Sequence, residues 1–176
     1  FRRERPQKGR QRQFTQFGLE TIGSNNYEQD VEVILIAYRI YEMLGISDLE
    51  LNINSIGSKK SRENYTKALI KYLLPFKNEL SQTSQMRLDT NPLRILDSKS
   101  SKDIKILNNA PIIHNYLEKN DLINFDMIKN SLENLGVPYK INTKLVRGLD
   151  YYNGLTFEIL SNSIGAQSAL CGGGRY

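Results

Sequence analysis

The chain has 176 residues, 39% of them hydrophobic, which suits one domain, or one domain with an insertion, around a buried core. Its single cysteine, Cys171, and single histidine, His114, exclude a disulfide framework and a zinc site, and no apolar run reaches the roughly 18 residues that span a bilayer. The net charge is +5, and residues 1–12 carry all of the excess. Such a local field favours a polyanion, for example nucleotide phosphates or an RNA backbone.

The first twenty residues, FRRERPQKGRQRQFTQFGLE, predict two antiparallel strands joined by a long basic loop, with Pro6 and Gly9 as turn formers. Period-two alternation divides QFTQFGLE into an apolar face and a face that presents a ring, an amide and a carboxylate. These polar-face positions are Phe14, Gln16, Gly18 and Glu20. Their spacing of about 6.5–7 Å suits the recognition of a small ligand. A solvated hairpin with a basic tip explains the pattern equally well.

The next elements are a helix over 27–44, closed by Gly45, and a half-buried strand over 49–57. The strand pattern places Leu49, Leu51 and Ile53 inward, and Glu50, Asn52 and Asn54 outward. On pattern alone, both elements belong to the core and have no chemical role.

Residues 58–138 form a mostly helical stretch with 13 basic and 9 acidic residues. The candidate helices are 61–74, 76–84, 102–108, 111–119 and 124–135. An accessory domain that contacts RNA fits this mild positive charge, but a helical spacer with ordinary surface lysines fits it better.

Strand patterns return at 139 and continue through LTFEIL, in which Leu155, Phe157 and Ile159 share one face. The pair Asn153-Gly154 predicts a type I′ hairpin turn. The closing glycines of CGGGRY indicate backbone close to a ligand, or a flexible hinge.

Several of these stretches resemble one family. FRRE, the basic loop and RQFTQFGLE resemble motif 2 of a class II aminoacyl-tRNA synthetase, in the form found in histidyl-tRNA synthetases. LVRGLDYYNGLTFEI at 145–159 and the terminal CGGGRY resemble that family's two histidine signatures. NSIG at 54–57 and NPLRILDSK at 91–99 extend the resemblance through the middle of the chain.

The resemblance implies an α+β fold, in which an antiparallel sheet of the class II synthetase type has flanking helices and is interrupted by a mostly helical insertion domain. The implied divisions are a catalytic core over 1–57, the insertion over 58–138, and the continued core over 139–176. The insertion of such enzymes approaches the acceptor arm of the tRNA.

The resemblance also implies that histidine and ATP give histidyl-adenylate, and that the histidyl group then passes to the 3′ end of tRNA(His). Arg2 and Arg147 match the catalytic arginines at the α-phosphate, with Arg147 as the principal one. Glu4 and Phe14 match the groups that read and stack on adenine, and Arg10 matches a contact to the γ-phosphate. ATP would carry Mg²⁺ to the site, and Lys8 and Arg12 are as well placed for tRNA.

Histidine itself is implied to bind Gln16, Glu20, Tyr151 and Tyr152. Gln16 matches a contact to the α-amino group, and Glu20 and Tyr152 match the pair at the imidazole. The chemistry is sensible, because an imidazole offers an N–H on one edge and an acceptor on the other. An apolar isostere of histidine would leave Glu20 and Tyr152 unpaired, so strong discrimination against such an analogue is attainable.

The chain starts inside motif 2, so we expect the natural N-terminus, the motif 1 dimer interface, motif 3 and the anticodon-binding domain to lie outside it. We therefore expect little or no histidine activation by this stretch alone, a homodimer in the full-length protein, no membrane association, and a cytoplasmic location, with an organellar one left open.

Two alternatives remain. One is a non-catalytic, synthetase-like regulatory subunit of the ATP phosphoribosyltransferase of histidine biosynthesis, against which the arginine loop, Arg147 and the insertion argue. The other is a plain RNA-binding module, against which Gln16 and Glu20 argue.

Overall fold

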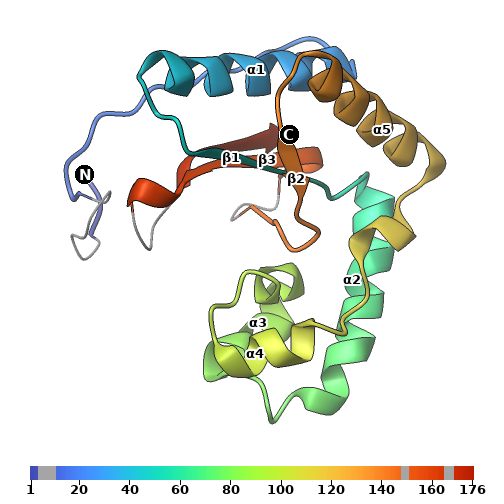
Figure 1. Ribbon diagram of the computed structural model, residues 1–176. Coiled ribbons are helices and arrows are strands. Elements are labelled where there is room, and N and C mark those ends of the chain that lie inside the picture. Colours follow the sequence, from blue (N-terminus) through green and yellow to red (C-terminus); the bar gives the residue numbers. More distant parts are fainter. Residues whose placement is uncertain (4–10, 148–150, 165–168) are drawn as a thin grey trace.

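The computed structural model describes residues 1–3, 11–147, 151–164 and 169–176 of the chain. Its centre is a four-stranded sheet with the order β2-β1-β3-β4 (Figure 1). The strands are β1 (Leu49–Ser55), β2 (Tyr139–Ile141), β3 (Asn153–Ser161) and β4 (Ala169–Arg175). The β1–β3 and β3–β4 pairs are antiparallel, and the short edge strand β2 runs parallel to β1. The predicted α+β class, with a mainly antiparallel sheet and flanking helices, is confirmed.

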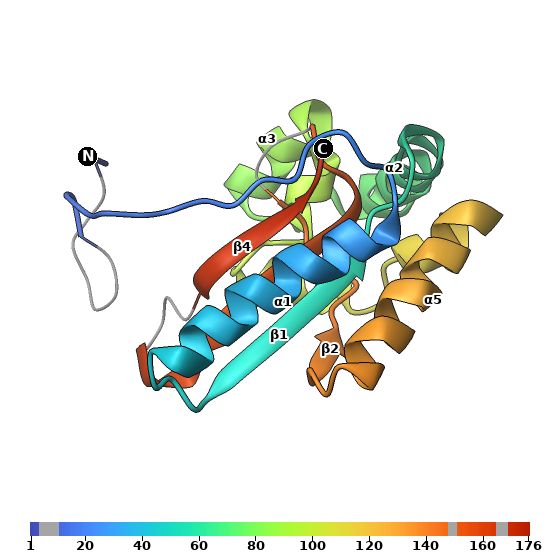
Figure 2. The same cartoon turned by 90° about the horizontal axis from the view of Figure 1, so that it is seen from above.

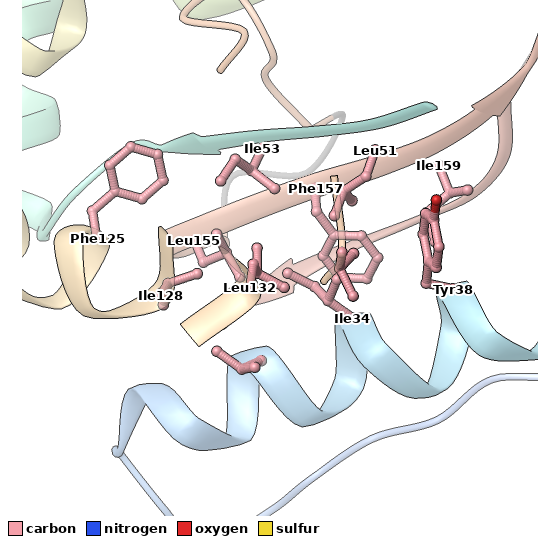
Figure 3. Close-up of a cluster of buried hydrophobic side chains, with 12 residues drawn as sticks. Ile34, Tyr38, Leu51, Ile53, Phe125, Ile128, Leu132, Leu155, Phe157 and Ile159 are labelled. Atoms are coloured by element: carbon pink, nitrogen blue, oxygen red, sulfur yellow. The ribbon is translucent and has the colours of Figure 1, made fainter. Parts of the chain in front are cut away.

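Two helices, α1 (Tyr27–Met43) and α5 (Lys119–Asn134), cover one face of this sheet (Figures 1 and 2). Gly45, just beyond the predicted end of α1, adopts a φ of 80°, the left-handed conformation that ends helices and that glycine adopts without strain. Inward side chains from both helices and the strands form one hydrophobic cluster, the sheet core (Figure 3). Its members are Val31, Ile34, Tyr38, Leu51, Ile53, Phe125, Ile128, Leu132, Val137, Leu155, Phe157 and Ile159.

A second cluster, the helical core, joins the elements between β1 and α5. These elements are α2 (Lys59–Leu73), α3 (Gln82–Thr90), α4 (Ser101–Leu107) and the 3₁₀ turns Leu74–Phe76, Pro92–Ile95 and Ile113–Tyr116. The buried Asp103 carboxylate stabilises the start of α3, where it accepts hydrogen bonds from the backbone N–H of Ser81 and from the hydroxyls of Ser81, Ser84 and Ser98.

Several sequence predictions in this helical part differ from the structure. The helix predicted over 76–84 is replaced by the 3₁₀ turn Leu74–Phe76, which contains Pro75, and by α3, which starts later at the Ser81 cap. The helix predicted over 111–119 is only the short 3₁₀ turn Ile113–Tyr116. Helix α5 lies within the predicted insertion range 58–138 but packs in the sheet core. The division at 58 and 138 itself stays a prediction.

Three further predictions were wrong. Residues 1–3 and 11–26 contain no strand, since an isolated hairpin is marginal without a sheet partner; one backbone hydrogen bond joins Arg2 N–H to Arg12 C=O at 2.8 Å. Asn52 and Asn54 lie on the face predicted for them, opposite the sheet core, but that face is covered and both side chains are buried instead of exposed. No hairpin forms at Asn153-Gly154, because β3 begins there and Gly154, at a φ of 58°, lies at an irregularity in its pairing with β4.

None of the described helices is long and apolar enough to cross a membrane.

Candidate functional site

Arg147 lies on the face of the sheet opposite α1 and α5, just after the buried Leu145. Its guanidinium extends over β4, where Gly172 provides the necessary space: a Cβ atom at that position would lie 2.8 Å from the Arg147 Cζ atom. An arginine side chain thus approaches the glycine run, and the predicted approach of a ligand stays a prediction. The missing side chain of Gly172 leaves room for the guanidinium in this position.

Among the described residues, only a long ion pair neutralises the charge of Arg147. Its Nη1 atom lies 3.5 Å from the Glu158 Oε1 atom, and each side chain retains about a quarter of its exposed surface (26% and 27%). Burial raises the pKa of Glu158, and the Arg147 charge opposes that rise. The buried Nε atom of Arg147 has no hydrogen-bond partner among the described residues. This guanidinium can therefore take an anionic ligand without breaking a strong ion pair.

Three tyrosines gather beside this arginine. The ring centroids of Tyr151 and Tyr152 are 4.6 Å apart, and those of Tyr151 and Tyr176 are 5.5 Å apart. The neighbouring Tyr152 hydroxyl raises the pKa of Tyr151, and the positive charge of Arg147 acts against that rise. The sequence therefore identified two members of a cluster of three.

Glu20 joins this cluster from the other end of the chain. Its carboxylate, near the Tyr176 hydroxyl, raises the pKa of Tyr176, and Tyr152 adds a smaller contribution. The structure thus brings together three of the predicted histidine-binding residues, Glu20, Tyr151 and Tyr152. Tyr176 was missed, although alternation along β4 places it on the same face as Gly172 and Gly174.

The rest of the N-terminal segment lies apart from this cluster. The guanidinium of Arg2 sits 4.9 Å from the centroid of the Phe14 ring, a cation–π contact that occupies the ring predicted to stack on adenine. Gln16 is exposed. Figure 2 shows the N-terminal end of this segment away from the sheet. In the described part of the chain, no hydrogen bond or ion pair connects Arg2 or Gln16 to Arg147.

Glu4, Lys8 and Arg10 lie outside the described residues, so the roles of Glu4 at adenine, of Arg10 at the γ-phosphate and of Lys8 near tRNA stay predictions. The described residues contain no cluster of three or more His, Cys, Asp or Glu side chains that could hold a metal ion.

A cavity of about 530 Å³ opens next to Tyr151, between the starts of α1, α2 and α5. The ion pair between Arg175 Nη2 and Asp30 Oδ2, at 3.1 Å, lies in its wall. Arg175 also donates to the carbonyl of Asn26, so it fastens the start of α1 to the end of β4. This cavity lies close to the tyrosine cluster. The charged group of Arg175 in its wall is already paired with Asp30.

Comparison with known proteins decides the family. The sequence model described as "Histidyl-tRNA synthetase" matches residues 1–176. The chain belongs to the histidyl-tRNA synthetase family. The predicted family is therefore confirmed.

Curated relatives of this family match the whole chain. A protein named histidine–tRNA ligase from Francisella philomiragia is 49% identical over 100% of this chain and 42% of its own length. A protein of the same name from Rippkaea orientalis is 51% identical over 100% of this chain and 41% of its own length. The chain thus spans about two fifths of the relatives that it matches.

Solved structures support the same fold. The apo histidyl-tRNA synthetase of S. aureus is similar with a TM-score of 0.67 and 37% sequence identity, over 88% of this chain and 37% of that one. A Bacillus halodurans protein described as an ATP phosphoribosyltransferase regulatory subunit/histidyl-tRNA synthetase aligns with a TM-score of 0.52 at 21% identity, a likeness of fold alone.

Proposed function

We propose that this chain is the catalytic segment of a histidine–tRNA ligase. In the first step a histidine carboxylate oxygen attacks the α-phosphorus of ATP, and pyrophosphate leaves. In the second step a ribose hydroxyl at the 3′ end of tRNA(His) attacks the carbonyl carbon of histidyl-adenylate, and AMP leaves. The observation that carries the proposal is the meeting of Glu20, Tyr152 and Tyr176 beside Arg147, in a chain of this family.

Arg147 is assigned the α-phosphate. The attacking carboxylate is already ionised at neutral pH, so this step needs alignment and positive charge rather than a general base. A guanidinium stays charged and binds phosphate oxygens through two parallel N–H groups. The weak pairing of Arg147 with Glu158 supports this role, because a phosphate can displace the carboxylate at little cost.

Glu20 and the tyrosine hydroxyls are assigned the imidazole of histidine. A carboxylate accepts from the imidazole N–H, and a phenol donates to the opposite nitrogen. The proximity of Tyr176 to Glu20 and Tyr152, which both raise its pKa, supports this assignment, because it places a carboxylate acceptor and phenol donors in one cluster. Gln16 would bind the α-amino group of the same ligand.

The remaining assignments concern ATP. Arg2 would bind the α-phosphate opposite Arg147, Glu4 and Phe14 would hold adenine, and Arg10 would reach the γ-phosphate. The Arg2 guanidinium lies over one face of Phe14, so adenine would stack on the other face or take the place of the guanidinium. Mg²⁺ would arrive on the phosphate oxygens of ATP.

The finer assignments follow from the same proposal. The enzyme would be of class II and would act as a cytoplasmic homodimer, with tRNA(His), histidine and ATP as its partners. Residues 1–57 and 139–176 would form its catalytic core, and residues 58–138 its helical insertion, next to the tRNA acceptor arm.

Charging of tRNA with labelled histidine by the full-length protein tests the proposal. We expect histidine-dependent exchange between ATP and pyrophosphate, and transfer of the label to tRNA(His). If the protein shows neither activity, the regulatory-subunit alternative is supported. RNA binding without adenylate formation would support an RNA-binding module. We also expect the 176-residue piece by itself to show little or no exchange.

A further inference from the structure

We propose that Asn54, held in place by His114, is a positioning residue that fixes the backbone before Arg147 and so places its guanidinium for adenylate formation. The inference rests on the proposed ligase function. It assigns a role in that reaction to a strand asparagine and to the single histidine of the chain.

Asn54 lies on the sheet face opposite the sheet core, with 0% of its surface exposed. Its Nδ2 atom donates to the carbonyl of Leu145 at 3.0 Å and lies 3.5 Å from the carbonyl of Thr143. Leu145 precedes Arg147 by two residues, and its own side chain is buried. One side-chain amide therefore holds the backbone that leads into the catalytic arginine.

His114 determines which way this amide points. Its Nε2 atom lies 2.8 Å from the Asn54 Oδ1 atom, and its ring stands edge-on to Phe125 with a centroid separation of 5.3 Å. An N–H on Nε2 donates to the Asn54 carbonyl oxygen, so the Asn54 NH₂ group must face the Leu145 carbonyl. His114 belongs to the 3₁₀ turn Ile113–Tyr116, so the helical part of the chain holds this asparagine.

Arg147 benefits from such support because its contacts with the described residues are weak. Among those residues, the Glu158 carboxylate is 3.5 Å away, the buried Nε atom has no hydrogen-bond partner, and Gly172 beneath the guanidinium provides space rather than a hydrogen bond. The backbone at 145–147 therefore contributes to the position of the guanidinium. A misplacement of about 1 Å in a catalytic group can cost about 100-fold in rate.

The same strand offers a matched control. Asn52 has the same side chain on the same face of β1 and is almost as buried, at 6% exposed, but its amide donates to Glu50 at 2.9 Å. Truncation of either asparagine removes a buried amide from this strand. Only the truncation at 54 removes the hydrogen bond to the backbone before Arg147.

The experiment compares Asn54→Ala with Asn52→Ala in the full-length protein, by histidine-dependent exchange between ATP and pyrophosphate. We expect kcat to fall about 10-fold or more for Asn54→Ala, with the KM for histidine changed less than about threefold. Asn52→Ala should leave both values close to wild type. Combined with Arg147→Lys, Asn54→Ala should cause little further loss, because it acts through that arginine.

Variants at His114 keep the test decisive if Asn54→Ala does not fold. His114→Phe retains a ring against Phe125 but has no nitrogen to donate, so it should lower kcat in the same way. His114→Gln can still donate to Asn54 and should recover part of the loss.

Two results would overturn the inference. The first is an equal kcat for Asn54→Ala and Asn52→Ala. The second is a double variant, Asn54→Ala with Arg147→Lys, whose loss in kcat equals the product of the two single losses. If the wild-type protein itself showed no histidine-dependent exchange, the proposed function would fail first and this inference with it. If the wild type is active and Asn54→Ala has the same kcat as wild type, this inference alone is overturned.

Discussion

The two halves of the candidate site are built in opposite ways. The half that carries Arg147 and the tyrosines is attached to the sheet, with Leu155 and Phe157 of the adjoining β3 buried in the sheet core. The half that carries Arg2, Phe14, Gln16 and Glu20 is an extended segment without strand pairing in its described part. Its Phe17 side chain is 69% exposed, although the sequence pattern places it on an apolar face.

This difference indicates how each half responds to change. Substitutions in the extended segment should alter ligand binding and leave folding almost unchanged, because exposed side chains contribute little to stability. Substitutions near Arg147 act on a formed structure, so they can move a catalytic group even where they touch no ligand.

The largest expected effect is that of Arg147→Lys. A lysine keeps the charge but loses the bidentate contact, so adenylate formation should fall by about 100-fold or more. The affinity for histidine should change much less. Equal losses in the rate and in histidine affinity, measured by exchange kinetics, would mean that the arginine has a structural role.

Glu20→Gln tests the extended half. The substitution removes the charged acceptor for the imidazole, so kcat/KM for histidine should fall about 30-fold, because a neutral amide oxygen accepts a weaker hydrogen bond than a carboxylate does. The melting temperature should stay within about 2 °C of wild type, since surface changes are usually small. A large fall in the melting temperature would show that this half contributes to the stability of the fold as the sheet half does.

Substitution of one glycine in each half of the site should have a smaller effect. Gly172→Ala would place a methyl group against the Arg147 guanidinium, whose side chain is flexible enough to move aside. We expect a fall of about 10-fold in adenylate formation with the fold retained. Gly18→Ala meets no described protein atom within 4 Å and should leave the melting temperature unchanged. A Gly172→Ala activity equal to that of wild type would contradict the role of Gly172 in placing Arg147.

The smallest expected effect is a pH dependence from His114, which joins the helical part to the sheet half. Burial, and secondarily the charge of Lys129, lower its pKa in the folded protein. As the pH falls from about 7 to about 5, the unfolded chain takes up a proton near its ordinary pKa of about 6.5, which the folded protein resists. Stability from this group is therefore present at neutral pH and is lost towards acid.

His114→Gln should reduce that loss. The check is the difference in melting temperature between wild type and variant at pH 7 and pH 5.5. A difference that is the same at both pH values would contradict the assignment.

The sequence predicted the elements whose patterns are strong. Alternation in LTFEIL correctly placed Leu155, Phe157 and Ile159 in the core, and Gly45 correctly ended α1. The three motifs led to the correct family.

Other features depend on packing between distant segments and left no local signal. Asn54 reads as an outward polar position, yet His114 and the backbone at 143–145 cover it from parts of the chain about 60 and 90 residues away. The extended segment has the alternation of a strand, but alternation supplies no partner strand. Of the candidate site, the sequence predicted the members of the tyrosine cluster except Tyr176; the contacts of Arg2 and Gln16 with a ligand stay predictions.

The most direct test is a crystal structure of the full-length protein with ATP and histidinol, a histidine analogue that lacks the reacting carboxylate. We expect the Arg147 guanidinium within about 3 Å of an α-phosphate oxygen, and the Glu20 carboxylate at a similar distance from an imidazole nitrogen. A structure in which Arg147 keeps its contact with Glu158 while the phosphates bind elsewhere, or in which the imidazole lies away from Glu20 and the tyrosines, would contradict the account.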